Sequence, residues 1–302
     1  MSAPVLFLSL ALSLPLPAAD PDHTRALPQL QALAERVGAD AIDPPRPAGR
    51  PVATAFLTRY SGARSTSAGR SVMLQGFHWE SHQSAPWWEV IASKASGISA
   101  SGFDLVWFPP SSSASSDEGY LPNRWYVQDS RYGAKAQLQK AVAALHSGGV
   151  KVLADIVINH RAGTAGWGDF TDPAWGPEAV CGDDEWSGAR GNADTGKGYH
   201  AARDLDHTQP FVQKGIQDWM NWLKSDIGYD GWRYDYVRGY GPKYLAMYDD
   251  ATSPAFSVVE IWDDFDVNGY DAHRQKTIDW LDSVSGRVSA FDFTTKGMLQ
   301  HA

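Results

Sequence analysis

The stretch Val150-Lys151-Val152-Leu153-Ala154-Asp155-Ile156-Val157-Ile158 is almost continuously apolar. An apolar run of this length, without alternating polar residues, is typical of a strand that is buried on both faces, as in a parallel sheet. Five further runs have the same character, and they cover residues 72–77, 103–110, 231–237, 257–262 and 287–293. The sequence therefore predicts six buried strands.

Apolar residues recur with helical spacing in three of the intervals between these runs. The first face comprises Trp88, Ile91, Ala95 and Ile98, the second Leu138, Ala141, Val142 and Leu145, and the third Val212, Ile216, Trp219, Leu223 and Ile227. Strands that alternate with helices are expected to run parallel to one another. The pattern therefore predicts one large α/β domain over residues 71–302.

Two α/β architectures share this pattern, the eight-stranded barrel and the open doubly wound sheet. A nucleotide-binding doubly wound sheet normally carries a glycine fingerprint after its first strand, whereas Gly76-Phe77-His78-Trp79-Glu80 stands there instead. We therefore favour a (β/α)8 TIM-type barrel. Residues 161–204 follow the third strand without a helical period, and we expect an irregular insertion that covers or builds a site.

The first seventy residues differ from the rest in composition. Residues 5–16 are apolar but too few to cross a bilayer, and Ala18 and Ala19 follow, so a signal peptide is predicted over residues 1–19. Residues 20–70 are predicted to form a linker or pro-segment. We therefore expect a secreted protein, extracellular or periplasmic. Residues 1–4 lack the usual Lys or Arg, which leaves the true translation start open.

Charge and cysteine content exclude some classes of function. The chain carries 26 Lys and Arg against 35 Asp and Glu, a net charge of -9, whereas nucleic-acid binding depends on clustered cations. We therefore expect no nucleic-acid partner, and no membrane partner either. Cys181 is the single cysteine, so no disulfide within the chain can brace the fold and a metal becomes a more plausible cross-link. A catalytic thiol is the weaker interpretation.

The fourth strand holds a cation beside a carboxylate. In Gly231-Trp232-Arg233-Tyr234-Asp235-Tyr236, side chains alternate, so Arg233 and Asp235 point to the same side. The arginine favours the ionised form of Asp235, as a nucleophile at a sugar carbon requires. A buried structural ion pair is the alternative.

The fifth strand, Ser257-Val258-Val259-Glu260-Ile261-Trp262, ends on a lone glutamate beside a tryptophan, a setting that disfavours the charged form. Retaining glycosidases pair one ionised and one protonated carboxyl group about 5 to 5.5 Å apart. Adjacent strands, about 4.8 Å apart, supply that separation for Asp235 and Glu260. Taken alone, a glutamate at a strand end is more often a capping or ion-pair residue.

The third strand runs into a polar cluster, Asp155-Ile156-Val157-Ile158-Asn159-His160. Such a strand end suits ligand contact in a barrel. A regular strand cannot direct Asp155, Asn159 and His160 to one side, so we expect a turn near Ile158. His160 is alternatively a loop histidine whose hydrogen bonds are satisfied within the protein.

Together these segments resemble the α-amylases of glycoside hydrolase family 13, most closely the plant-like and related bacterial subgroup. The resemblance covers residues 71–302 nearly continuously. The phrases that carry it are Gln75-Gly76-Phe77-His78-Trp79-Glu80, Gly119-Tyr120-Leu121-Pro122, residues 155–160, residues 222–240, Val259-Glu260-Ile261-Trp262 and Ala290-Phe291-Asp292-Phe293-Thr294-Thr295-Lys296-Gly297.

The resemblance implies roles for individual residues. By matching position, the nucleophile is Asp235, the general acid/base Glu260 and the invariant arginine Arg233. The sugar at the cleavage point would stack on Tyr120 and hydrogen-bond to His160, with Trp262 and Arg238 toward the leaving group.

Family members also bind Ca²⁺ between the barrel and the third-strand insertion. The matching side chains are Asn159 and Asp204, with Ala201 and Gly239 as carbonyl donors, and oxygen ligands of this kind suit calcium. The family often has a further aspartate where this chain has Gly198, so weaker calcium binding is expected.

The implied substrate is starch or a related α-1,4-glucan, cleaved internally with retention. The family's third catalytic carboxylate follows its seventh strand, and no match to that phrase is present in this sequence. We therefore expect an incomplete barrel of about six strand–helix units, truncated at its C-terminal side. Its first and sixth strands are expected to be exposed edges. We expect little hydrolysis from this chain. Two alternatives stay open: an α-glucan transferase or oligosaccharide-forming amylase, and a noncatalytic glucan-binding fragment.

Overall fold

A computed structural model describes residues 71–166 and 168–302 of the chain. The signal peptide predicted over residues 1–19 and the linker predicted over residues 20–70 lie outside the described residues. Within the part that is described, no helix has both the length and the apolar character needed to cross a bilayer.

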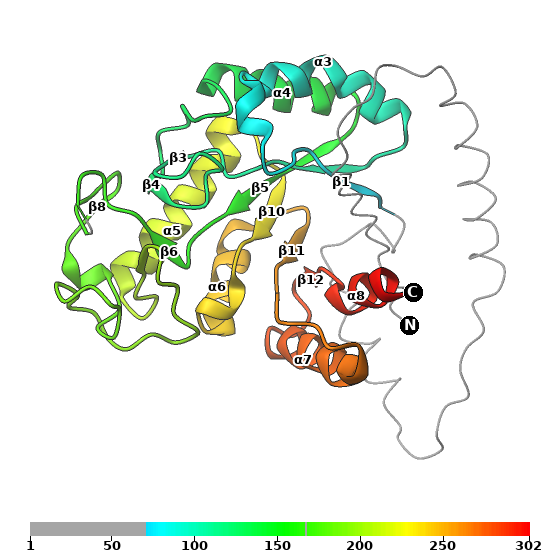
Figure 1. Cartoon of the computed structure of the whole chain (residues 1–302). Helices are drawn as coiled ribbons and strands as arrows, with labels where there is room; N and C mark the ends of the chain where they lie inside the picture. The colour runs from blue at the N-terminus through cyan, green and yellow to red at the C-terminus, as the bar shows by residue number, and fades with distance from the viewer. Residues whose placement is uncertain (1–70, 167) are drawn as a thin grey trace. The chain divides into compact units, whose positions relative to one another are not determined.

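The centre of the described region is a six-stranded parallel sheet (Figure 1). Its strands, in spatial order, are β1 (Met73–Gln75), β2 (Leu105–Trp107), β5 (Lys151–Ile156), β10 (Gly231–Tyr234), β11 (Ser257–Val259) and β12 (Ser289–Ala290). Each lies inside one of the six apolar runs, so the predicted strands and their parallel direction are confirmed, although each strand is shorter than its run. Among the described residues, β1 and β12 form the two edges of the sheet.

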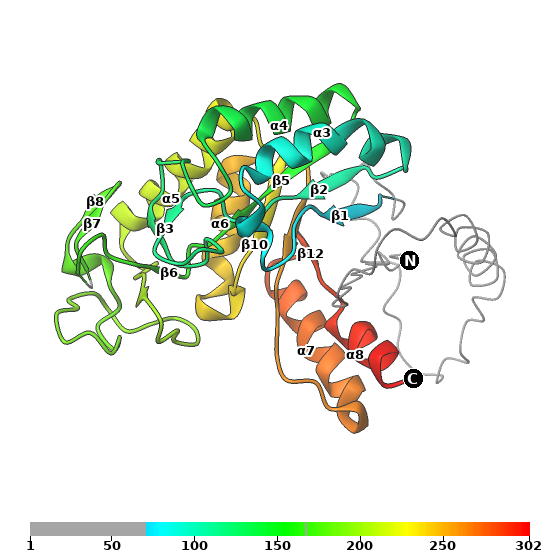
Figure 2. The ribbon, with the colours of Figure 1, turned by 45° about the horizontal axis from the view of Figure 1, so that its top comes forward.

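In the described residues six α-helices accompany the sheet, and α3 and α4 lie side by side in both ribbon views (Figure 2). They are α3 (Trp87–Ala100), α4 (Lys135–Ser147), α5 (Pro210–Trp222), α6 (Pro242–Thr252), α7 (Tyr270–Ser283) and α8 (Phe293–His301). Short 3-10 turns occur at η2 (Ser81–Ser84), η3 (Pro177–Ala179), η5 (Val237–Gly239) and η6 (Val267–Gly269).

The three predicted apolar faces are buried. The third face differs in one respect, because α5 ends at Trp222 and the chain continues as a π-helix, η4 (Leu223–Ile227). Leu223 and Ile227 remain buried in this wider helix. Gly228 then ends it with a φ of 98°, a left-handed conformation that favours glycine.

Strand alternation separates two apolar clusters on the two faces of the sheet. Val106, Val152 and Val259 point toward the helices and join the larger cluster. Leu105, Trp107, Leu153 and Val258 join a smaller cluster on the opposite, concave face. Phe291, which follows β12, contacts Trp107 on β2 with ring centroids 5.5 Å apart. Strands that are distant in the sheet order therefore meet across this face, which is the curvature of a partly formed barrel.

The insertion after β5 has little regular structure, as expected. Its short strands form two antiparallel pairs, β6 (His160–Arg161) with β9 (Arg203–Asp204) and β7 (Phe170–Thr171) with β8 (Ala174–Trp175). A further hairpin, β3 (Ser113–Ala114) with β4 (Pro122–Arg124), holds the loop that carries Tyr120. The predicted turn near Ile158 is also confirmed, since β5 ends at Ile156 and His160 already pairs in a different sheet.

Candidate active site

The side chains of Asp155, Asp235 and Glu260 converge on one buried guanidinium at the carboxyl ends of three adjacent strands. Arg233 Nη1 lies 2.8 Å from Asp155 Oδ1 and 2.6 Å from Asp235 Oδ1, and its Nη2 lies 2.8 Å from Glu260 Oε1. In the parallel register, Arg233 on β10 is level with Asp155 on β5 and Val258 on β11. Strand alternation then places Asp235 and Glu260 one step further along the same concave face.

Asp155 is fixed by more partners than either of the other carboxylates. Its Oδ1 accepts from Arg233, while its Oδ2 accepts from Trp107 Nε1 at 3.0 Å and from Tyr120 Oη at 2.9 Å. Burial raises the pKa of Asp155, and the Arg233 charge opposes that rise. Asp155 therefore orients both the arginine and the tyrosine. The sequence placed Asp155 in the polar strand end but assigned it no role, because its partners come from distant segments.

Backbone hydrogen bonds hold the two remaining carboxylates in place. Asp235 N donates to Ile156 O at 3.0 Å, and Glu260 N donates to Tyr234 O at 3.0 Å, which continues the sheet register beyond the strands. Glu260 Oε2 also accepts from Tyr236 N at 3.3 Å. Burial raises the pKa of Glu260 while Arg233 opposes the rise, and the neighbouring Asp235 carboxylate adds to it. The direction agrees with a glutamate that keeps its proton.

Tyr120 lies between this cluster and an exposed tryptophan. Its ring is stacked on Trp79, with centroids 5.8 Å apart and an interplanar angle of 7°, and Trp79 is 61% exposed. On its other side the Arg233 guanidinium carbon lies 5.9 Å from the Tyr120 ring centroid. Trp79 lies within the first-strand motif, and the sequence indicated no role for it. Its exposure beside a predicted sugar-stacking residue could not be deduced without the tertiary contact.

His160 is buried and its ring nitrogens already have neighbours in the protein. Nε2 lies 2.8 Å from the Tyr120 carbonyl oxygen and Nδ1 lies 3.3 Å from Asn159 Nδ2. The ring stacks on Tyr199 with centroids 4.0 Å apart. Burial lowers its pKa to about 4. His160 is therefore neutral near pH 7, and it supports the backbone of the loop that carries Tyr120.

Trp262 and Arg238 line a pocket of about 320 Å³ that adjoins the carboxylate cluster along the chain. Arg238 follows Asp235 by three residues and Trp262 follows Glu260 by two. Trp262 is 57% exposed. The structure thus brings these two predicted leaving-group residues together in one pocket, whose other walls come from the insertion and α7.

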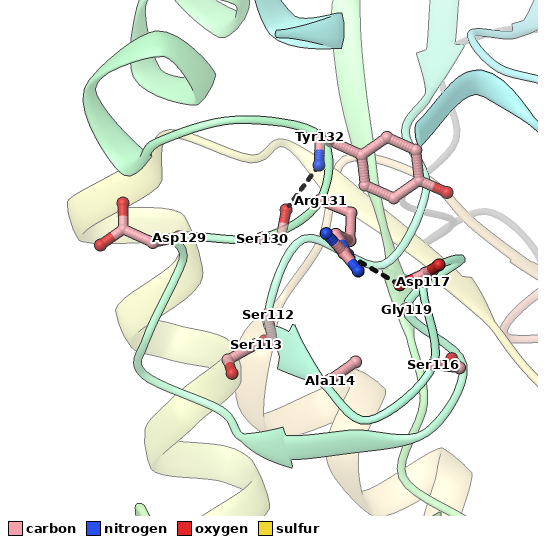
Figure 3. Close-up of a pocket in the computed structure, with 10 residues that line it drawn as sticks. All are labelled: Ser112, Ser113, Ala114, Ser116, Asp117, Gly119, Asp129, Ser130, Arg131 and Tyr132. Carbon is pink, nitrogen blue, oxygen red and sulfur yellow. Dashed lines mark hydrogen bonds and ion pairs between the residues drawn. The ribbon is translucent and has the colours of Figure 1, made fainter. Parts of the chain in front are cut away.

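A second pocket, of about 180 Å³, lies beside the loop that carries Tyr120 (Figure 3). Serine side chains line it, together with an ion pair between Arg131 Nε and Asp117 Oδ1 at 2.7 Å. Tyr132 Oη donates to the Glu118 carbonyl oxygen at 3.0 Å. These bonds tie the loop to the turn before α4, so this pocket supports the position of Tyr120.

The predicted calcium ligands are partly gathered. Asn159 Nδ2 donates to Asp204 Oδ1 at 3.0 Å, while Asn159 Oδ1 is buried without a hydrogen-bond partner. A Cβ at Gly239 would collide with this same Oδ1, so the Gly239 backbone lies against it. Burial raises the pKa of Asp204 to about 7, which a nearby cation would reverse. Among the predicted ligands, Asn159 therefore offers an unsatisfied buried oxygen, and Asp204 and the Gly239 backbone lie beside it.

Two further positions, Ala201 and Gly198, concern the same predicted calcium site. Ala201 is exposed. A side chain at Gly198 would point at Asp204, because its Cβ would lie 3.3 Å from Oδ2. The aspartate that the family often has there would thus reach this cluster.

Asp194 is a further oxygen donor that the sequence did not indicate. Its Oδ2 is buried without a hydrogen-bond partner, and its charge raises the pKa of Asp204. Gly196, two residues later, packs against the Gly239 backbone. Only the folding of the insertion brings Asp194 near the other candidates, since it precedes Asp204 by ten positions in the sequence.

Comparisons with known proteins agree with this architecture. The family model described as "Alpha amylase, catalytic domain" matches residues 84–173. The chain is 41% identical over 250 residues to "Alpha-amylase 3, chloroplastic" of Arabidopsis thaliana, covering 78% of this chain and 28% of that protein. It is 40% identical over 247 residues to "Probable alpha-amylase 2" of the same plant, covering 78% of this chain and 59% of that protein.

Solved structures show the same fold at lower identity. An Anoxybacillus α-amylase superposes with a TM-score of 0.53 at 18% identity, covering 73% of this chain and 50% of that one. An α-amylase from Malbranchea cinnamomea superposes with a TM-score of 0.51 at 22% identity, covering 65% and 43%. The chain thus spans only part of the relatives it matches. The described residues form an incomplete (β/α)8 barrel, and the chain is similar to the α-amylases of glycoside hydrolase family 13 over the part that it covers.

Proposed function

We propose that this site cleaves internal α-1,4-glucosidic bonds of starch-like glucans with retention of anomeric configuration. The observation that carries the proposal is the sharing of one guanidinium by Asp235 and Glu260, at 2.6 and 2.8 Å. Two carboxyl groups on one guanidinium are close enough for the roughly 5 to 5.5 Å separation typical of retaining enzymes.

The two carboxyl groups take different roles in the proposed reaction. Asp235 Oδ1 is held by Arg233, and the Asp235 carboxylate attacks the anomeric carbon to form a glycosyl ester. The departing glycosidic oxygen takes the proton of Glu260, whose pKa burial raises. The Glu260 carboxylate then removes a proton from water, which attacks the same carbon and releases Asp235.

Neighbouring residues would orient the sugar rather than react with it. Trp79, stacked on Tyr120, offers an exposed ring on one side, and Trp262 offers an exposed ring on the leaving-group side. The transferase alternative differs only in the acceptor, a sugar hydroxyl in place of water. The appearance of longer oligosaccharides at high acceptor concentration would favour it.

The decisive experiment is reducing-sugar release from soluble starch by the 302-residue chain with calcium, beside Asp235→Asn. Slow release that Asp235→Asn abolishes would support the proposal. Binding of starch in a pull-down without any release from a folded sample would instead favour the noncatalytic glucan-binding alternative. Equal release by both proteins would overturn the role of Asp235.

We propose that calcium binds to Asn159, Asp204 and the Gly239 carbonyl, with Asp194 as a further donor. When bound, calcium would cross-link the insertion to the end of β5, and it takes no part in the reaction steps above. The unsatisfied oxygens of Asn159 and Asp194 support this assignment. Ala201, the fourth predicted donor, remains part of the proposal although it is exposed.

Cys181 offers a direct test of that cross-link. It is the single cysteine, it is buried in the insertion, and burial raises the pKa of its thiol, which argues against a catalytic thiol. Native protein should react slowly with a thiol reagent, and a chelator should speed the reaction in the wild type but not in Asp204→Asn. A rate that calcium does not change would overturn the proposed site.

We further propose export of the mature protein. The apolar residues 5–16 support it, whereas the name of one Arabidopsis thaliana relative is "Alpha-amylase 3, chloroplastic". N-terminal sequencing of protein recovered from an expression host would test cleavage near residue 19. An intact N-terminus in the cell fraction would count against export.

A further inference from the structure

The pocket that contains Trp262 and Arg238 has an unusual charge for this protein. Its ionisable walls include Lys197, Arg238 and Lys276 against the single carboxylate of Asp263. The whole chain has the opposite balance, with a net charge of -9. A local excess of cations in an acidic protein favours an anionic ligand, because unlike charges attract most strongly where solvent is partly excluded.

The donors of Arg238 are largely unused. Its Nη1 lies 3.4 Å from Asp263 Oδ1, a long hydrogen bond, and its Nε is buried without a partner among the described residues. Asp263 is instead bound more closely by Lys276, whose Nζ lies 2.9 Å from Oδ2. One carboxylate therefore serves two cations and leaves the guanidinium with spare hydrogen-bonding capacity.

Lys197 adds a third cation from the insertion. Its backbone N donates to the Arg238 carbonyl oxygen at 2.9 Å, which fixes the two residues side by side. The structure gives its ammonium group no ion-pair partner within residues 71–166 and 168–302. His273 also lines the pocket, and its Nδ1 lies 2.8 Å from Thr294 Oγ1.

We propose that this pocket binds a phosphoryl group esterified to a glucose unit on the leaving-group side of the site. Trp262, 57% exposed, supplies a ring face for the sugar, and Arg238 and Lys197 supply donors for the phosphate oxygens. The inference rests on the proposed glucan substrate and names a substituted form of it. Phosphate esters suit this pocket because a guanidinium and an ammonium together match their charge and geometry.

The test compares the affinities of two ligands for the full chain in the presence of calcium. The chain carries Asp235→Asn, so that no cleavage occurs during the measurement. The ligands are maltotetraose and maltotetraose with one 6-phosphate at its reducing-end glucose, and their affinities are measured by calorimetry. We expect the phosphorylated sugar to bind about tenfold more tightly, the gain from about one net charge-assisted hydrogen bond. This ratio should fall as sodium chloride is raised.

Lys197→Gln in the same background should lower the ratio about threefold, in line with a partly exposed ion pair. The matched control is Lys214→Gln, which removes a lysine that pairs with Asp218 on α5. This control should leave the ratio unchanged. Circular dichroism of the variants checks that each is folded.

The outcomes separate this inference from the proposed function. Equal affinity for both sugars would overturn the phosphate site and leave the glucan site standing. Binding of neither sugar would overturn both, and binding of the phosphorylated sugar alone would support the phosphate site against the neutral glucan. Inorganic phosphate that binds as tightly as the phosphorylated sugar would show that the pocket takes free phosphate, and it would overturn the sugar ester as the ligand.

Discussion

Two buried arginines, Arg233 in the sheet and Arg161 in the insertion, are held in contrasting ways. Arg233 is surrounded by three carboxylates within 2.8 Å and lies 4.7 Å from the Trp107 ring centroid. Arg161 lies about 5 Å from the ring centroids of Trp125, Phe170 and Trp175, and its nitrogens donate to the carbonyl oxygens of Asn123 and Pro173.

The difference in surroundings distinguishes an arginine in a candidate active site from an arginine with a structural role. Burial raises the pKa of Glu260, Arg233 opposes this rise and the Asp235 carboxylate adds to it, so the direction favours a glutamate that holds a proton for a leaving group. Aromatic rings and carbonyl groups hold a cation without any group that can exchange protons near neutral pH. Arg161 therefore joins the insertion to the β3–β4 hairpin and performs no chemistry.

The largest effect is expected for Arg233→Met. Removing the cation leaves three carboxylates buried without compensation, and the free energy of unfolding should fall by about 3 to 5 kcal/mol. Urea denaturation followed by tryptophan fluorescence measures this loss. The control Arg287→Met breaks an exposed pair with Asp250, and its cost should be below about 1 kcal/mol. Equal losses in both variants would contradict the organising role of Arg233.

Arg161→Met should cost less, about 2 kcal/mol. The thioether fits among aromatic rings, so the loss comes mainly from carbonyl oxygens left without donors. The same urea titration measures it, and faster labelling of Cys181 would show that the insertion has loosened. A loss as large as that of Arg233→Met would mean that the aromatic cage is not the milder environment inferred here.

Trp107→Phe should cost about 1 kcal/mol. It keeps an aromatic ring beside Arg233 but removes the hydrogen bond from Nε1 to Asp155 Oδ2. Tyr120 Oη still donates to that oxygen, so Asp155 is not left unpaired. If the bond orients Arg233, the variant should also bind maltotetraose more weakly; unchanged affinity would restrict Trp107 to packing.

The smallest effect is expected for Glu260→Gln, and it should depend on pH. Because burial raises the pKa of Glu260 in the folded state, its contribution to stability is complete below the usual glutamate pKa and is lost as pH rises through the folded value. Glutamine cannot ionise, so the variant should gain stability relative to the wild type between pH 4 and pH 8. Urea midpoints at the two pH values measure this trend. An opposite trend would mean that Arg233 outweighs burial.

Much of the fold could be predicted because burial on both faces leaves a plain pattern. The six apolar runs each contain one strand, and the helical faces at Trp88, Leu138 and Val212 are buried as expected. The end of α5 was not predictable, since Leu223 and Ile227 keep helical spacing while the backbone widens into a π-helix. Apolar spacing reports which residues are buried and does not distinguish two helices of similar pitch.

The sequence by itself determined the strands, their parallel direction, the pairing of Arg233 with Asp235 and the resemblance to the α-amylases. These depend on spacing along one strand or on continuous motifs. Only the tertiary structure decided that Asp155 holds Trp107, Tyr120 and Arg233 together, and that Lys197 meets Arg238 and Lys276 in one pocket. The physical reason is that a sheet register and a folded insertion bring together groups whose separation along the chain carries no signal of their contact.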